Sequence, residues 1–175
     1  MTVSNLFGEE GPTRSLIQFG EQFQFHRDRN QLSFSGQVAL DHLPLTAEPL
    51  QEPTSVILIP GVRRLDCEYL QLTFARNRVD QADSTSAQVP DLTAVERIEA
   101  RGEIFAETVG PQAREHFFAG DSLVYDIKTD ILVIQGKRSM PAYFDLEPFS
   151  MVQWNRRSGQ IIAIPAATGT IDASF

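Results

Sequence analysis

The sequence predicts an all-β protein built from short antiparallel hairpins. Apolar side chains recur at every second position in many short segments, which is the period of a half-buried strand. Turn residues, among them ten prolines and eleven glycines, stand mostly between these segments. Helical spacing is scarce: it occurs at 91–99, where it runs straight into a strand pattern, so a helix there is the less favoured interpretation. Short strands separated by turns are typical of a sandwich, a barrel or a solenoid.

The expected strands fall into two halves on either side of a polar stretch. Residues about 15–76 form the half with weaker signals, and residues about 92–172 form the clearer half. Residues 77–90 are mostly polar and are predicted to be a surface loop within a single domain spanning 1–175. The expected strands are 19–25, 32–38, 56–59 and 69–74 in the first half, and 97–105, 118–126, 131–136, 151–154, 160–164 and 168–171 in the second.

Turn residues and loops separate the strands of the second half. Tight turns are expected at 128–130 and at 155–159, where Asp, Asn, Ser and Gly gather. Longer loops are expected at 108–116 and around Pro141 and Pro148. Each of these connections is short enough to join neighbouring antiparallel strands, which favours stacked hairpins.

A glycine pattern repeats along the chain. An apolar residue, one further residue, Gly, one residue and then Val or Ile occur at 34–38 and 100–104, with a weak echo at 168–171. A second pattern, a polar or acidic residue followed by alternating apolar positions, occurs at 66–74 and 121–125, and more loosely at 150–154. A single hairpin cannot bury its apolar face, whereas stacked hairpins bury a continuous interior. The glycines either form bulges that bend the strands or simply end turns, and the pattern favours neither.

Charge and cysteine content exclude several classes of protein. The formal net charge is −8 and the basic residues are dispersed, whereas nucleic-acid binding needs clustered Lys and Arg. Two adjacent basic pairs among those in the sequence, Arg63-Arg64 and Arg156-Arg157, are interpreted as solvated strand ends rather than anion sites. The single cysteine, Cys67, excludes an internal disulfide, and its apolar neighbours favour a small buried residue over a nucleophile.

The sequence shows no membrane helix and no secretory signal. Its apolar runs are far shorter than the ~20 residues that a membrane helix needs. Residues 1–11 carry two glutamates and lack the basic and apolar regions of a signal peptide. We therefore expect a soluble chain, whose targeting segment lies outside this sequence if the protein works in the cell envelope.

Catalytic and metal-binding patterns are not recognisable in the sequence. The three histidines, His26, His42 and His116, stand in no nucleophile motif and are interpreted as solvated or interfacial. His, Cys and carboxylate side chains do not gather at metal-binding spacing, and phosphate-loop and dinucleotide patterns are missing. We expect no enzyme, no metal site and no cofactor.

The clearer half resembles the repeat of the OstA/LptA family of lipopolysaccharide-transport domains. Residues 100–104 are similar to its A-x-G-x-V element, residues 119–126 to the L-x-Y-D element that follows, and residues 131–136 to L-x-L-x-G. Residues 152–159 resemble the next repeat, with Trp154 where Tyr or Phe is usual. The first half matches only at 34–38 and 66–74.

The resemblance implies a fold and a function. The implied fold is an open β-jelly roll of stacked antiparallel hairpins, a β-taco. Members of this family hold the acyl chains of lipid A inside the fold and join end to end as a bridge in the periplasm. The implied partners are therefore lipopolysaccharide or another acyl-chain ligand, together with related OstA-like domains or further copies paired by strand addition, and no nucleic acid.

Alternation along the strands identifies the candidate lipid-groove residues. They share the apolar face on which the acyl chains would lie. The candidates are Phe34, Val38, Leu70, Leu72, Phe74, Ile104, Leu123, Tyr125, Leu132, Ile134, Val152 and Trp154.

Two other functions stay open at this point. The same side chains could fill an ordinary core, which would make the chain a structural or interaction scaffold that associates edge to edge. A carbohydrate-binding β domain would need an aromatic platform, and Trp154 is the single tryptophan.

Overall fold

The described part of the chain forms one antiparallel sheet. The computed structural model describes residues 2–4, 13–44, 63–75, 95–109, 115–137 and 139–166. The sheet has eleven strands, and one short 3-10 turn, η1 (Arg27–Arg29), lies between two of them. The strands are β1 (Thr2–Ser4), β2 (Thr13–Gln18), β3 (Gln22–His26), β4 (Gln31–Pro44), β5 (Arg63–Phe74), β6 (Val95–Val109), β7 (Glu115–Asp126), β8 (Ile131–Gln135), β9 (Ala142–Phe144), β10 (Glu147–Asn155) and β11 (Gln160–Pro165).

The long strands bend in the middle, and the bend is a bulge. Pairing of β4 with β5 breaks between Ser35 and Val38, and pairing of β6 with β7 breaks between Arg101 and Ile104. A comparable break interrupts the pairing of β5 with β6. Each bulge leaves residues unpaired and turns the strand sharply, so one long strand contributes to two layers.

Glycine makes these bulges possible. Gly36 and Gly102 have φ of +78° and +75°, a left-handed conformation that other residues adopt only with strain. The residues that follow them, Gln37 and Glu103, are left-handed as well, with φ of +49° and +41°. Of the two interpretations that the sequence left open for these glycines, the bulge is the one that the structure shows.

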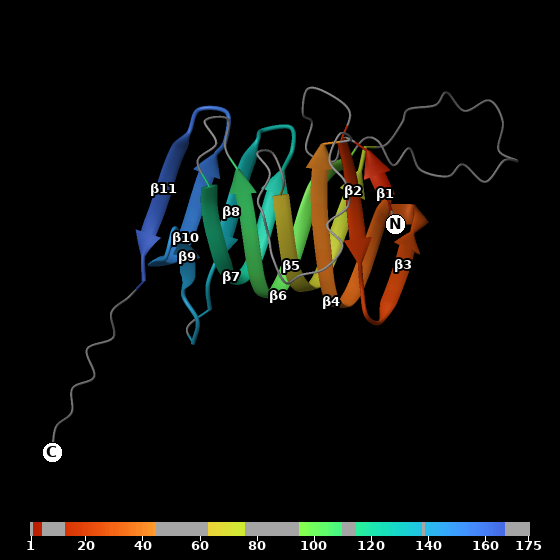
Figure 1. The fold of residues 1–175 in the computed structure, drawn as a ribbon, viewed down its shortest axis with the longest axis horizontal. Coiled ribbons are helices and arrows are strands. Elements are labelled where there is room, and N and C mark those ends of the chain that lie inside the picture. The colour runs from red at the N-terminus through yellow and green to blue at the C-terminus, as the bar shows by residue number, and fades with distance from the viewer. Residues whose placement is uncertain are drawn as a thin grey trace, which may run out of the picture.

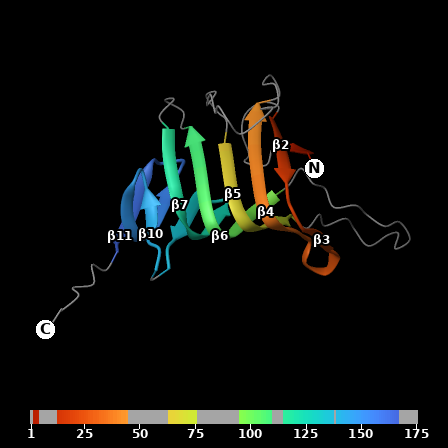
Figure 2. The same cartoon turned by 60° about the horizontal axis from the view of Figure 1, so that its bottom comes forward.

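The bends divide the sheet into two arms joined along a spine. The first arm contains β3, residues 31–35 of β4, 69–74 of β5, 95–101 of β6 and 122–126 of β7, then β8, residues 151–155 of β10, and β11. The second arm contains β1, β2, residues 38–44 of β4, 63–66 of β5, 104–109 of β6 and 115–120 of β7, then β9 and residues 147–149 of β10. Figure 1 shows the strands in order from β11 at one end to β1 and β3 at the other, and Figure 2 shows the long strands curving back at the spine.

The core lies between the arms. Side chains on the facing surfaces of both arms pack into one cluster, as alternation along each strand predicts. The cluster includes Leu32, Phe34 and Leu70 from the first arm, and Leu40 and Phe118 from the second. The described chain is therefore a sheet folded on itself, with its apolar face inside.

Several expected boundaries need correction. The loop expected at 108–116 is shorter, because β6 extends to Val109 and β7 begins at Glu115. The loop expected around Pro141 and Pro148 contains β9 and the start of β10, which pair with each other in the second arm. β6 begins at Val95, so the described part of 91–99 is strand. The strands expected at 56–59 and 168–171 and the loop at 77–90 lie outside the described residues.

Candidate functional site

The candidate groove residues all belong to the core between the arms. Eleven of the twelve are buried, and Leu132 is partly buried and packed against them. They come from both arms, because the bulges send each long strand into both layers. The interior that they form is continuous along the sheet, but most of it is filled by the side chains themselves.

A small cavity remains between the arms. Its volume is about 50 Å³, enough for a few water molecules, since each needs roughly 10–15 Å³ by this measure. Four candidate residues line it, and the other eight pack elsewhere in the core. The four lining residues are Leu123, Tyr125, Leu132 and Trp154.

Five further apolar residues of the cavity wall were not among the candidates predicted from the sequence. Leu40, Leu65, Ile98, Ala106 and Phe118 also line it. All five are buried, and alternation extended by two residues from Val38 and Ile104 would have found two of them, Leu40 and Ala106. Only the face could have been found in this way, because the cavity itself depends on which bent strands come to lie opposite one another.

Aromatic side chains join the two arms beside the cavity. Trp154 of the first arm lies 5.5 Å from Phe118 and 5.2 Å from His116 of the second arm, measured between ring centroids. His116 also stacks on Phe144 at 5.4 Å, and its Nδ1 lies 3.0 Å from an Asp145 carboxylate oxygen. His116 is thus a packing residue between the arms. These rings pack between the arms near β10.

Arg156 lies at the open side of this cavity. It follows β10 directly, and its backbone N–H donates to the carbonyl of Asp130, at the turn between β7 and β8, over 3.0 Å. Its Nη1 donates to the hydroxyl of Tyr125 at 2.6 Å, and that hydroxyl donates to an Asp130 carboxylate oxygen at 2.6 Å. The guanidinium also lies over the rings of Tyr125 and Trp154. The prediction that Arg156 is a solvated strand end is wrong, because its side chain is only 18% exposed.

Turn chemistry explains why these groups meet. Asp126 ends β7, and its carboxylate accepts hydrogen bonds from the backbone N–H and the hydroxyl of Thr129, which fixes the turn and lowers the pKa of Asp126. Asp130 then adopts the left-handed conformation, with φ of +55°. Asn155 fixes the next turn on this rim by accepting from the backbone N–H of Ser158. Two neighbouring turns therefore present Asp130 and Arg156 to each other.

Two candidate nucleophiles, Cys67 and Ser15, are buried. Cys67 is buried, and loss of solvation raises the pKa of its thiol to about 12, so it is not a thiolate at neutral pH. Ser15 Oγ lies 2.6 Å from His42 Nδ1, but both residues are fully buried on the inner face of the second arm. In the described parts of the chain, His, Cys and carboxylate side chains form no group that could hold a metal ion. No described helix has the length and apolar character of a membrane span.

Apolar side chains are exposed at both ends of the sheet. Phe19, Phe23 and Phe25 are 40%, 47% and 38% exposed beside β3. Ile162 and Ile164 of β11 are each 48% exposed at the opposite end. Within the described residues, β3 pairs only with β4, and β11 pairs only with β10. Each end therefore offers one strand edge with apolar side chains.

No family model matches the chain, and no curated protein matches it. A solved structure of LptH from Pseudomonas aeruginosa is similar, with a TM-score of 0.54 and 10% identity over 92% of this chain and 89% of that chain. The chain has the LptH fold. LptH is described as the LptA-homologous periplasmic component of the lipopolysaccharide transport device. The predicted fold class, an all-β jelly roll of stacked antiparallel hairpins, is confirmed.

Proposed function

We propose that this chain is a non-enzymatic module of the cell envelope that works in the periplasm. It binds the acyl chains of lipopolysaccharide, or of a related lipid, between its two arms during lipid transport to the outer membrane. We also propose that residues 1–175 form a single OstA-like domain. The observation that carries the proposal is the folded sheet with its apolar interior, an architecture shared with LptH.

Binding requires the arms to separate. A cavity of about 50 Å³ does not hold an acyl chain. The strand hydrogen bonds of each arm run within that arm, and the arms meet through side chains such as Trp154 and Phe118. Apolar side chains that part around an acyl chain exchange one apolar contact for another, so opening need not expose the interior to water. The candidate groove residues would then line the opened groove.

The small cavity also supports a second function. If the arms stay closed, the same side chains form an ordinary filled core, and the chain is a structural scaffold. Both functions predict the same stable sheet, so lipid binding is the property that separates them.

Quenching of Trp154 fluorescence by a brominated fatty acid tests lipid binding directly. Trp154 is the single tryptophan, and bromine quenches only on contact. We expect saturable quenching of the native chain, and weakened quenching in Leu132→Arg, which places a charge on the inner face. The matched control is Val133→Arg, the next residue of β8, which pairs with Gln153 and Val124 on the outer face. A native chain that is not quenched would favour the scaffold.

End-to-end association is the second part of the proposal. The first arm runs β3-β4-β5-β6-β7-β8-β10-β11, and every neighbouring pair is antiparallel. β3 and β11 therefore point in opposite directions, and a second copy placed end to end would pair β11 with β3 as antiparallel strands. Such strand addition supports further copies, or related domains of the transport device, as partners.

Light scattering across a concentration series tests this association. We expect the mass of the native chain to rise above 19.6 kDa with concentration. The double variant Ile162→Lys/Ile164→Lys should stay monomeric, because charges on an edge strand oppose pairing. Gln153→Lys is the control, since Gln153 lies opposite Ile162 on the neighbouring strand β10, which is not an edge. A native chain that stays monomeric at high concentration would contradict end-to-end pairing.

A further inference from the structure

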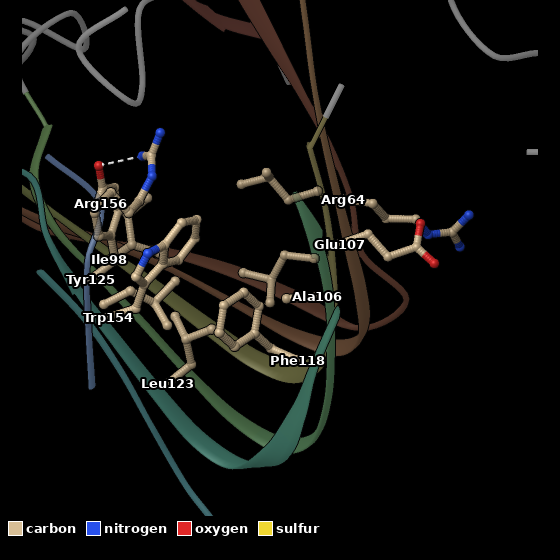
Figure 3. A pocket seen from close by; sticks show the side chains of 12 residues that line it. Arg64, Ile98, Ala106, Glu107, Phe118, Leu123, Tyr125, Trp154 and Arg156 are labelled. Atoms are coloured by element: carbon tan, nitrogen blue, oxygen red, sulfur yellow. Dashed lines mark hydrogen bonds between the residues drawn. The ribbon is translucent and has the colours of Figure 1, made fainter. Parts of the chain in front are cut away.

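One charged side chain faces the mouth of the cavity. Three charged residues line the cavity, namely Arg64, Glu107 and Arg156. Figure 3 shows the side chains of Arg64 and Glu107 pointing away from the interior, and Arg64 Nε is paired with Asp66 at 2.7 Å. Arg156 lies with Trp154 on the open side of the bent sheet. An apolar cavity with one cation at its mouth matches an amphiphile that carries an anion.

Several N–H donors of the Arg156 guanidinium have no acceptor among the described residues. It carries five N–H donors, and its contacts with Tyr125 and Asp130 both use Nη1. Among the residues that the structure describes, no acceptor meets its Nε or Nη2. These groups form the planar fork that binds phosphate or carboxylate through two hydrogen bonds. Among the described residues, the carboxylate that pairs with Arg156 is that of Asp130, 3.5 Å from Nη1, so Nε and Nη2 are left for an anion.

Arg156 is also held in place. Its backbone is anchored to the turn at Asp130, and its guanidinium carbon lies 5.4 Å and 5.9 Å from the ring centroids of Tyr125 and Trp154. A positioned cation loses little side-chain freedom when an anion binds. Trp154 lies between Arg156 and the inner residues of the cavity, so a chain that displaced Trp154 would leave its head group beside Arg156.

We propose that Arg156 binds the anionic head group of the lipid whose acyl chain enters between the arms. The ligand is then an anionic amphiphile, with a phosphate at the rim of the first arm and its chain directed towards the spine. This inference rests on the proposed lipid binding and adds to it the class of ligand, its orientation and one recognition residue.

Dodecyl phosphate tests the proposal, with dodecyl maltoside as the uncharged probe of equal chain length. Both are titrated below their critical micelle concentrations, and binding is followed by Trp154 fluorescence in the full chain. We expect Arg156→Gln to bind dodecyl phosphate roughly 10- to 100-fold more weakly, because a hydrogen-bonded charge pair is lost. Its affinity for dodecyl maltoside should be unchanged. The matched control is Arg157→Gln, which removes the same charge from an exposed neighbour and should leave both affinities unchanged.

The other possible results of this experiment would overturn the proposal in different ways. Equal weakening of both probes in Arg156→Gln would overturn head-group recognition and leave Arg156 as a residue that shapes the groove. If the Arg156 and Arg157 variants lose the same affinity for dodecyl phosphate, the effect is one of overall charge. That result would also overturn head-group recognition by Arg156. Displacement of dodecyl phosphate by inorganic phosphate at equal concentration would assign the site to free anions. Binding of neither probe to the native chain would overturn the proposed function together with this inference.

Discussion

Phe118→Ala is expected to lower the free energy of unfolding by about 3–5 kcal/mol, the cost of removing a large buried aromatic ring. Phe118 is fully buried in the second arm and contacts Trp154 across the interior and Phe144 within its own arm, at 5.5 Å and 5.1 Å. Its loss removes packing between the arms and leaves a void that the rigid sheet cannot fill by collapse. Urea denaturation followed by Trp154 fluorescence measures the change.

Phe105→Ala is the control for this prediction. Phe105 lies on β6, opposite Ala119 of β7, but it is 38% exposed and contacts Phe117 rather than the interior. We expect the free energy of unfolding to fall by about 1 kcal/mol or less, since an exposed edge-to-face pair contributes little. Similar losses in the two variants would show that the interface between the arms is not the stabilising core. If the groove opens for lipid, Phe118→Ala should keep or gain affinity for the brominated fatty acid while it loses stability.

Gly102→Ala is expected to destabilise the chain by about 2–4 kcal/mol through two additive causes. The left-handed backbone of Gly102 costs an alanine about 1 kcal/mol. A Cβ at this position would also clash with Oε2 of Glu68 and lie 2.9 Å from its Cβ, so Glu68 must move or the bulge must open, at about 1–3 kcal/mol. The shift of the urea midpoint, at unchanged slope, measures the sum.

Gly159→Ala separates the two causes. Gly159 is also left-handed, with φ of +71°, but no heavy atom lies within 4 Å of a Cβ built there. We expect this variant to lower the free energy of unfolding by about 1 kcal/mol, which is the cost of the left-handed backbone alone. Adding Glu68→Ala to Gly102→Ala should recover part of the larger loss, because it removes most of the clashing side chain. Equal losses for the two single glycine variants would argue against a sterically crowded spine.

Local sequence was sufficient for most of the longer strands and for their inner face, but not for β1, β2 and β9. Leu70, Leu72 and Phe74 alternate with polar residues, and all three are buried as that period requires. The glycines at 36 and 102 marked the bends before any pairing was known, although the pattern alone did not distinguish a bulge from a turn end. The groove candidates that alternation placed on one face are buried, or partly buried at Leu132, because this property depends on the strand's own backbone.

The sequence pattern could not predict contacts between distant segments of the chain. Arg156 appeared solvated because it follows a strand and stands beside a second arginine, yet its side chain contacts Asp130, Tyr125 and Trp154. The strand at 142–144 was missed because proline normally interrupts a strand, but Pro148 lies in an edge segment of the second arm, where it is tolerated.

The amino-acid sequence by itself determined that this protein is built from strands with one apolar face, because a period of two acts within a few residues. Only the tertiary structure decided which of those apolar residues border a cavity and which charge stands at its mouth. Those features arise where two arms of bent strands face each other. The pairing that brings Trp154 against Phe118, and Arg156 against Asp130, joins residues that no local pattern connects.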